Sequence, residues 1–418
     1  MLRRKIASFE AGFLPSNYNI AVGLRCKDKK SVDLVVDKLA KSFCGFHTHI
    51  EGDEFVFKPR DVPVYKLPSN VTSLQDQIYY LENNFMKNPS QIMSSIAISD
   101  NSVVFSSSHG LYDGTTVKDF INSLSDGKEL PKLKLSESIF DPFLKEIQST
   151  KCTIPNYFTD KDALRFTSSD NDFKSIPGNS TVINEILYDN EFQIYDKKDK
   201  KLHGLTEASF SSLVLAVSAL NGKFEKTGLL EVIGMRNNAS KNLDLRQGQY
   251  IANIPISIKA TTDTTIREMM NLYRKDMKEK LANKATFQFM KGMKDGFPEG
   301  PIINGAPIIL SSIGNFTVHG PLTDAYMMTT SYGDVPFAHL PMIMYSVDDG
   351  KKKKFVLSCN YSTKTLSSRE GTAFTALTAY SLKNIDLNMK IGEAVDRLIE
   401  EKKNIYKKTN TIDRVIKF

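Results

Sequence analysis

The chain has 418 residues, of which 41% are hydrophobic and 25% are charged, and its formal net charge is +7. This composition is typical of a folded globular protein and excludes a largely disordered chain. No apolar run reaches the length of about 18 residues that a membrane-spanning helix requires, so we predict no transmembrane segment. The length is enough for two packed domains of about 150 to 200 residues each.

The cysteines and the N-terminus indicate the compartment. The first six residues are basic, but they are not followed by the apolar run and cleavage site of a signal peptide. The four cysteines, Cys26, Cys44, Cys152 and Cys359, form no C-x-x-C pair and are typical of reduced, buried thiols. We therefore expect a cytoplasmic protein, and peripheral association with an internal membrane stays open. The positive charge is modest and spread along the chain, which suits an anionic ligand and predicts no nucleic-acid partner.

The first part of the chain alternates predicted strands and helices. Periodicity and turn residues predict a strand over 19–25, a helix over 31–43, a hairpin over 45–57 and a helix over 73–84. His47 and His49 would share one face of that hairpin. Because no third ligand follows at a spacing typical of metal sites, we predict no bound metal.

The next segment, 96–124, carries the chemistry. Two short β-rich runs joined by Asp100-Asn101 predict a hairpin, and the apolar spacing over 115–124 predicts a helix capped by Thr115 or Thr116. His109 lies between the second strand and the helix. A rigid scaffold commonly presents catalytic side chains on such a loop.

The spacing His109-x-x-x-Asp113-Gly114 has a chemical interpretation. An imidazole can take a proton from an alcohol or amine as it attacks, and then return the proton to a leaving thiolate. Asp113 can pair with a cation and fix the loop, and Gly114 permits an unusual backbone angle or a close approach. A solvent-facing histidine in a turn fits the bare spacing as well.

The residues Ser107-Ser108-His109-Gly110-Leu111-Tyr112-Asp113-Gly114 resemble the His-His-x-x-x-Asp-Gly signature of the chloramphenicol-acetyltransferase-like superfamily. That superfamily includes alcohol acetyltransferases, polyketide-associated acyltransferases and peptide condensation domains. Ser108 replaces the first histidine, whereas the second, catalytic one is His109. The resemblance implies an α/β fold of two sandwich domains with a tunnel at their interface.

The second half continues the alternation after a polar, proline-containing stretch over 125–178, which is linker-like. We place the domain boundary near residue 175, giving domains 1–175 and 176–418. Further elements are predicted in the following ranges: strands over 181–188, 229–236, 250–258, 342–347 and 354–361, helices over 207–220 with Thr206 as cap, 265–282, 367–382 and 391–408, a charged helix or loop over 196–201, and an exposed hairpin tip over 351–354.

Two further positions gain a role from the resemblance. Arg236 stands at a strand end where the family places the arginine that forms a salt bridge with the motif aspartate, so we predict an Asp113–Arg236 pair; a solvated strand end fits the same residue. The strand that begins at residue 308 breaks into small residues, Ser311, Ser312 and Gly314, which resemble the stretch that lines the family's tunnel near the thioester. Their hydroxyls could hold an oxyanion, and an ordinary turn explains them equally well.

These expectations lead to one function and three alternatives. The resemblance, nearest to the alcohol acetyltransferase and polyketide-associated branch, implies an acyl-CoA-dependent O- or N-acyltransferase with His109 as general base. Acyl-CoA would be a co-substrate, no cofactor would be permanently bound, and we expect a monomer. The acceptor would be an alcohol or amine, and the Phe- and Met-rich segment 286–293 favours a hydrophobic one. A carrier-protein-dependent acyltransferase, a catalytically silent module that binds CoA or a partner protein, and a hydrolase stay open.

Some motifs are absent from the sequence. There is no G-x-S-x-G motif, P-loop, dinucleotide-binding glycine pattern or zinc-protease motif. The chain has no tryptophan and so cannot carry the Asp-Phe-Gly-Trp-Gly motif of plant BAHD acyltransferases.

Overall fold

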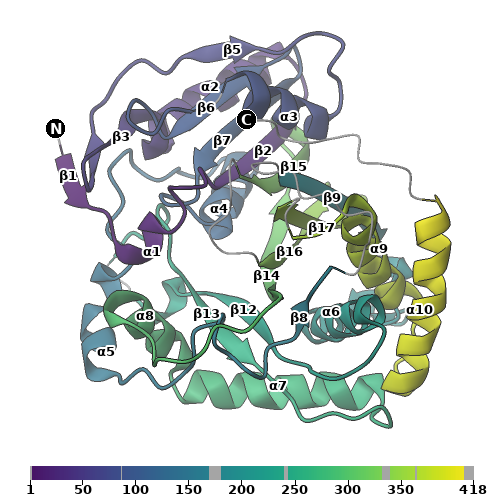
Figure 1. Cartoon of the computed structure of the whole chain (residues 1–418). Coiled ribbons are helices and arrows are strands. Elements are labelled where there is room, and N and C mark those ends of the chain that lie inside the picture. The colour runs from purple at the N-terminus through teal and green to yellow at the C-terminus, as the bar shows by residue number, and fades with distance from the viewer. Residues whose placement is uncertain are drawn as a thin grey trace.

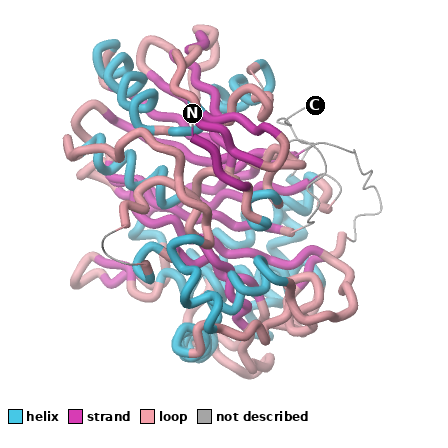
Figure 2. Tube along the Cα trace, turned by 90° about the vertical axis from the view of Figure 1, so that its left-hand side faces the viewer, coloured by secondary structure: helices cyan, strands magenta, loops and turns pink. Residues whose placement is uncertain are grey.

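Two β-sheets, each covered by helices, make up most of the computed structural model (Figure 1). The structure describes residues 2–85, 87–168, 180–239, 243–331, 339–362 and 365–408. The predicted domain boundary at residue 175 lies outside these described residues. Figure 2 shows the strands running through the middle of the molecule, with helices and loops around them.

The first sheet has five strands in the order β15-β2-β7-β6-β5. The bounds are Leu322–Thr330 for β15, Asn19–Cys26 for β2, Ser102–Ser108 for β7, Ser94–Ile98 for β6 and Val64–Lys66 for β5. Helices α2 (Lys29–Ser42) and α3 (Leu74–Asn84) pack against it through buried side chains such as Val35, Leu39 and Ile78. The predicted hairpin around Asp100-Asn101 is confirmed as the antiparallel pair β6 and β7.

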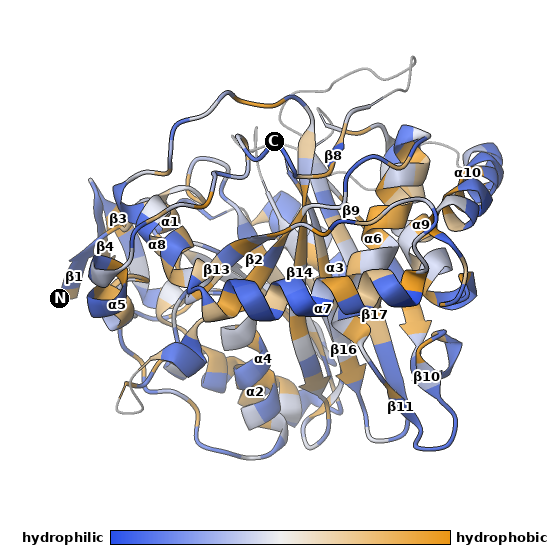
Figure 3. Ribbon diagram, turned by 90° about the horizontal axis from the view of Figure 1, so that it is seen from below, coloured by the Kyte–Doolittle hydropathy of each residue, from blue (hydrophilic) through white to orange (hydrophobic). Residues whose placement is uncertain are grey.

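The second sheet has seven strands, six of them in the order β13-β12-β14-β16-β17-β9, with β8 paired to β14. The bounds are Ile251–Ile256 for β13, Leu229–Gly234 for β12, Ala306–Thr317 for β14, Leu340–Asp348 for β16, Lys353–Ser362 for β17, Ser180–Tyr188 for β9 and Arg165–Phe166 for β8. Four helices cover it: α6 (Leu205–Asn221), α7 (Ile266–Ala282), α9 (Ser368–Asn384) and α10 (Ile391–Lys408). In Figure 3, apolar residues concentrate in the strands and on α6, and the outer faces of α7 and α10 are polar.

Each half of the chain contributes a strand to the sheet of the other half. β15 follows β14 in sequence, yet it runs antiparallel to β2 of the first sheet, from Leu322 opposite Cys26 to Thr330 opposite Asn19. β8 precedes the second half, yet it pairs with the beginning of β14. The two sheets are therefore joined by the chain itself as well as by packing.

A third hydrophobic cluster lies between the two halves and includes the region that we predicted as a linker. Ile139, Phe143 and Ile147 of that region, which contains helix α5 (Leu144–Ser149), are buried together with Phe287 and Phe289 of α8 (Ala285–Asp295). Helix α1 (Ser8–Ala11) packs on α8 through Phe9. The linker prediction was wrong because scattered apolar residues without regular spacing still supply a packed cluster.

Smaller predictions have mixed outcomes. The helix predicted over 265–282 is confirmed as α7, with Thr265 as its N-cap that accepts the backbone N–H of Glu268, whereas α6 begins after Gly204 instead of being capped by Thr206. Of the two alternatives for the charged run over 196–201, the loop is confirmed for residues 197–200, which connect the short strands β10 (Tyr195–Asp196) and β11 (Lys201–Leu202) of a small hairpin. In the described part of the chain, no helix is both long and apolar enough to cross a membrane.

Candidate active site

The loop that carries His109 is fixed at both of its ends. At the beginning, the backbone N–H of His109 donates to the carbonyl oxygen of Tyr18 at 2.8 Å, directly after β7 ends at Ser108. At the end, α4 (Gly114–Ser125) begins with Asp113 as its N-cap, and the carboxylate accepts the backbone N–H of Thr116 at 2.9 Å. The predicted caps Thr115 and Thr116 were wrong, because the motif aspartate takes that position.

Asp113 forms the predicted ion pair with Arg236. The distance from Arg236 Nη1 to Asp113 Oδ2 is 2.6 Å, and the two side chains are 15% and 1% exposed. The same oxygen accepts the backbone N–H of Tyr250 at 2.8 Å. Burial alone would raise the pKa of Asp113, but the charge and hydrogen bond of Arg236 and the two backbone N–H groups hold this pKa below its usual range. The carboxylate is therefore ionised.

Arg236 connects the His109 loop to the second half of the chain through several hydrogen bonds. Its Nη2 donates to Thr116 Oγ1 at 2.8 Å and to the carbonyl oxygen of Gly248 at 3.0 Å, and its Nε donates to the carbonyl oxygen of Leu245 at 2.8 Å. A planar guanidinium with several donors is suited to such a junction. The strand itself ends at Gly234, and Arg236 opens a short 3-10 turn, so the predicted strand end lay two residues too far along the chain.

A glycine is required at position 114 because the beginning of α4 lies very close to β14. A Cβ atom at this position would lie 2.3 Å from Cδ1 of Ile313 on β14. Its φ angle is not among the positive ones, so of the two predicted reasons the structure supports the second. The N-terminus of α4 is therefore pressed against β14 at the interface of the two sheets.

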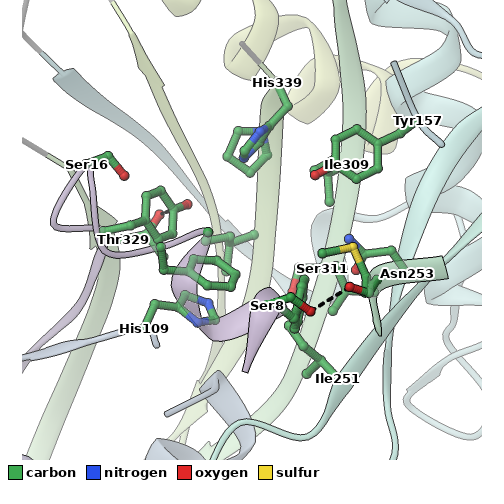
Figure 4. Close-up of a pocket in the computed structure, with 18 residues that line it drawn as sticks. Ser8, Ser16, His109, Tyr157, Ile251, Asn253, Ile309, Ser311, Thr329 and His339 are labelled. Carbon is green, nitrogen blue, oxygen red and sulfur yellow. Dashed lines mark hydrogen bonds between the residues drawn. The ribbon is translucent and has the colours of Figure 1, made fainter. Parts of the chain in front are cut away.

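A cavity of about 180 Å³ lies beside His109 and is lined from both halves (Figure 4). His109 and Thr329 line it from the first sheet, and Ile251, Asn253, Ile309 and Ser311 line it from the second. Apolar and aromatic side chains form much of the remaining lining, and hydroxyl, amide and imidazole groups lie among them.

The imidazole of His109 is held within this lining. Phe13 stacks on it with ring centroids 4.6 Å apart and planes inclined by 9°, and Tyr18 lies at 5.6 Å. Nδ1 is 3.1 Å from Nε2 of Gln249. Burial lowers the pKa of His109 below its usual range, although hydrogen bonds to backbone carbonyls and the charge of Asp113 act in the opposite direction. The ring is therefore neutral near pH 7 and able to accept a proton.

The small residues on β14 divide between two environments. Ser311 lines the cavity, whereas Ser312 and Gly314 are exposed and lie outside it. β14 does not break there: it continues to Thr317, with a bulge between Ser312 and Gly314, and Gly314 has a φ of +101°. The predicted strand-end turn was wrong, and the structure brings only Ser311 of the three together with His109.

Several lining residues were not predicted. Six come from the first eighteen residues of the chain and share no pattern that would have identified them: Ser8, Phe9, Gly12, Phe13, Ser16 and Tyr18. His339 lies across the cavity from His109 in Figure 4. Asn253 lies in the predicted strand over 250–258 and Gln249 directly before it, but neither was predicted to be a site residue.

The two histidines considered as metal ligands serve protein contacts. His47 lies in a 3-10 turn, where its Nε2 is 2.8 Å from the carbonyl oxygen of Ala40 and its Nδ1 accepts the backbone N–H of Arg60. His49 on the adjacent strand pairs with Glu51 at 2.9 Å. The two rings therefore do not share a strand face as predicted.

Comparison with known proteins places the fold and leaves the family open. No family model matches the sequence, and no curated protein matches it. Among solved structures, polyketide synthase associated protein 5 from Mycobacterium tuberculosis is similar with a TM-score of 0.62 and 11% identity, over 91% of this chain and 97% of that one. The X-domain in its complex with OxyB from teicoplanin biosynthesis gives 0.60 and 11%, over 94% and 96%. The epimerization domain from the third module of tyrocidine synthetase B gives 0.56 and 11%, over 96% and 98%.

These similarities show a condensation-like fold of the chloramphenicol-acetyltransferase type, with two α/β domains, which confirms the predicted fold class. At such low identity they show the fold alone.

Proposed function

We propose that the protein is an acyltransferase that moves an acyl group from a thioester to an alcohol or amine, with His109 as general base. One observation carries this proposal: the imidazole of His109 lines a cavity between the two sheets, on a loop that the Asp113–Arg236 pair fixes to the other half. Asp113 and Gly114 hold the loop in place, and Arg236 anchors it.

The proposed reaction is a direct transfer. His109 accepts the proton of the acceptor O–H or N–H while the acceptor oxygen or nitrogen attacks the thioester carbonyl. The tetrahedral intermediate then collapses, the C–S bond breaks, and the imidazolium returns the proton to the departing thiolate. The products are an ester or amide and a free thiol. Ser311 lines the same cavity, which supports a role for its hydroxyl as a donor to the oxyanion.

Two acyl donors are compatible with the proposal: acyl-CoA and an acyl thioester on a carrier protein. Acyl-CoA as co-substrate follows from the sequence resemblance to alcohol acetyltransferases and polyketide-associated acyltransferases. A thioester on a carrier protein is supported by the fold, because the similar structures include domains from teicoplanin biosynthesis and from tyrocidine synthetase B. In neither case does the scheme require a permanently bound cofactor.

The cavity also supports a hydrophobic acceptor or acyl chain. Phe9, Phe13, Met293 and Ile343 contribute to its lining. Ser312 and Gly314, which we predicted to bind the acyl-CoA, are exposed and lie outside this cavity, and the proposal assigns them no role.

A catalytically silent binding module is the second candidate function. Two observations favour it: Ser108 stands where the family has its first histidine, and a similar structure is an X-domain in complex with OxyB. Such a module would bind a partner protein or CoA without turnover.

The test is thiol release from a series of acyl-CoAs and from an acylated phosphopantetheinyl carrier protein, each with a panel of alcohols and amines. Acceptor-dependent release from one donor class establishes the transferase and identifies the donor. Release that requires no acceptor indicates hydrolysis. If no mixture releases thiol above the His109→Ala background, the transferase proposal is contradicted, and calorimetric titration with CoA then tests the silent module.

A further inference from the structure

A general base needs a group that determines which ring nitrogen carries the proton, and Asp113 is not that group. Oδ1 of Asp113 accepts the N–H of Thr116, and Oδ2 accepts from Arg236 and from the N–H of Tyr250. The carboxylate is therefore occupied by the contacts of Asp113 and Arg236 with Thr116, Gly248 and Tyr250 that hold the His109 loop, which we call the clamp. Among the described residues, the backbone carbonyls of His109 and Tyr112 lie within hydrogen-bonding reach of the imidazole, and the side chain that contacts its Nδ1 is Gln249, whose amide lies 3.1 Å away.

The backbone on both sides of Gln249 belongs to the same clamp. The preceding residue, Gly248, accepts hydrogen bonds from Arg236 and Thr116 through its carbonyl oxygen. The following residue, Tyr250, donates its N–H to Asp113. Gln249 itself is 2% exposed. The ion pair that fixes the His109 loop therefore also fixes the residue that reaches the imidazole from the opposite domain.

The two ends of a glutamine amide differ in chemistry but hardly in shape, so their assignment follows from the hydrogen-bond network. With the NH₂ group toward Nδ1, the imidazole proton must sit on Nε2, and Oε1 of Gln249 is buried without a hydrogen-bond partner among the described residues. With the amide turned by half a rotation, Oε1 accepts a proton held on Nδ1. Only this second arrangement leaves the lone pair of Nε2 available to a substrate.

We propose that Gln249 is the positioning residue that sets the tautomer of His109, with its carbonyl oxygen accepting Nδ1–H so that Nε2 is the base. This inference rests on the proposed role of His109 in acyl transfer. It assigns to an uncharged amide the task that a carboxylate performs in a Ser-His-Asp triad. Without a carboxylate at Nδ1, the imidazole keeps a low proton affinity, which suits a base that must also release its proton to a thiolate.

The direct test needs no substrate. The ¹⁵N chemical shifts of both His109 ring nitrogens, assigned through their loss in His109→Ala, report the tautomer at a pH where the ring is neutral. We expect the proton on Nδ1 in the wild type and a shift toward the Nε2-protonated form in Gln249→Leu. A wild-type ring protonated on Nε2, or the same tautomer in Gln249→Leu, would overturn the proposal.

A matched control separates this role from simple loss of a buried amide. Gln247 lies two residues away, is 3% exposed, and donates its Nε2–H to the carbonyl oxygen of Lys132, away from the imidazole. Gln247→Leu therefore removes the same chemical group from the same segment. We expect it to leave the His109 shifts unchanged, and an equal change in both variants would contradict a specific role for Gln249.

Kinetics add a second readout once a donor and acceptor are known. Gln249→Leu should lower kcat on the order of 10²-fold with little change in KM, because the imidazole loses its orientation while the cavity stays. Gln249→Glu keeps an oxygen at Nδ1 and adds a negative charge, so the acid limb of the pH profile should move to higher pH. An unmoved limb in Gln249→Glu would argue against contact with the ring. If no donor is found, the tautomer measurement still decides, so this proposal and the proposed function can fail separately.

Discussion

The two walls of the cavity are built by different means. On one wall, His109 is presented by a loop whose aspartate is 1% exposed and forms three hydrogen bonds, one of them charged at both ends. On the other wall, Ser311 of β14 lines the cavity, Ser312 and Gly314 are exposed, and a bulge lies between these two residues. A buried charge with fixed partners permits one arrangement, whereas a strand segment of small, partly exposed residues permits several. We expect the first wall to be intolerant of substitution and the second to tolerate it except at Ser311.

Among substitutions in the two walls, His109→Ala is expected to cause the largest loss of turnover. Loss of a general base costs about 10² to 10⁴ in rate, and the methyl group leaves the clamp untouched. Thiol release measured beside circular dichroism and thermal unfolding should show lost turnover with an unchanged fold. Turnover within a factor of about two of wild type would remove His109 from the chemistry.

Arg236→Ala should be the most damaging change to the clamp itself. Removing one partner of a buried ion pair typically costs about 3 to 5 kcal/mol, because the remaining charge is left uncompensated. Urea unfolding measures this loss of stability. Arg236→Lys keeps the charge but not the several donors of the guanidinium, so it should be less destabilised than Arg236→Ala. The difference between wild type and Arg236→Ala should shrink as the pH falls: the pKa of Asp113 is lowered in the folded state, so its contribution is present above the unfolded pKa of about 3.9 and is lost below it. Equal stability of wild type and Arg236→Ala at neutral pH would contradict the clamp.

Two matched serine substitutions on β14 compare a residue that lines the cavity with one that lies outside it. Ser311→Ala should lower kcat by about 10²-fold if its hydroxyl donates to the oxyanion, because such a donor contributes mainly in the transition state. Ser312→Ala should leave kcat and KM unchanged, since this side chain lies outside the cavity. Steady-state kinetics of the two variants with one donor decide between them, and equal behaviour would show that Ser311 has no special role.

Gly114→Ala tests the contact between the walls and should have the smallest effect. The added Cβ would meet Cδ1 of Ile313 at 2.3 Å, and overpacking of this kind costs about 1 to 3 kcal/mol. Ile313→Val removes that Cδ1 atom, so the double variant should recover part of the stability lost in thermal unfolding. Simple additivity of the two changes would indicate that the glycine is needed for another reason.

The sequence predicted the first wall better than the second for a physical reason. The resemblance carried by His109, Asp113 and Gly114 implied a specific partner for the aspartate, and the Asp113–Arg236 pair was found. The same sequence did not reveal the bulge after Ser312, because that depends on register with β16. Nor did it reveal the exchange of β15 and β8 between sheets, or the contributions of Phe9, Phe13 and Tyr18, because these follow from long-range packing with no local periodic signal.

The pH dependence of kcat/KM in the wild type tests the central claim most directly. A general base must be neutral to act, and burial lowers the pKa of His109. Activity should therefore rise with pH through an acid limb below about 6.5, the ordinary imidazole value, and should stay high at neutral pH. A profile without an acid limb above about pH 4, or one in which activity falls as the pH rises through 5 to 7, would contradict a basic role for His109.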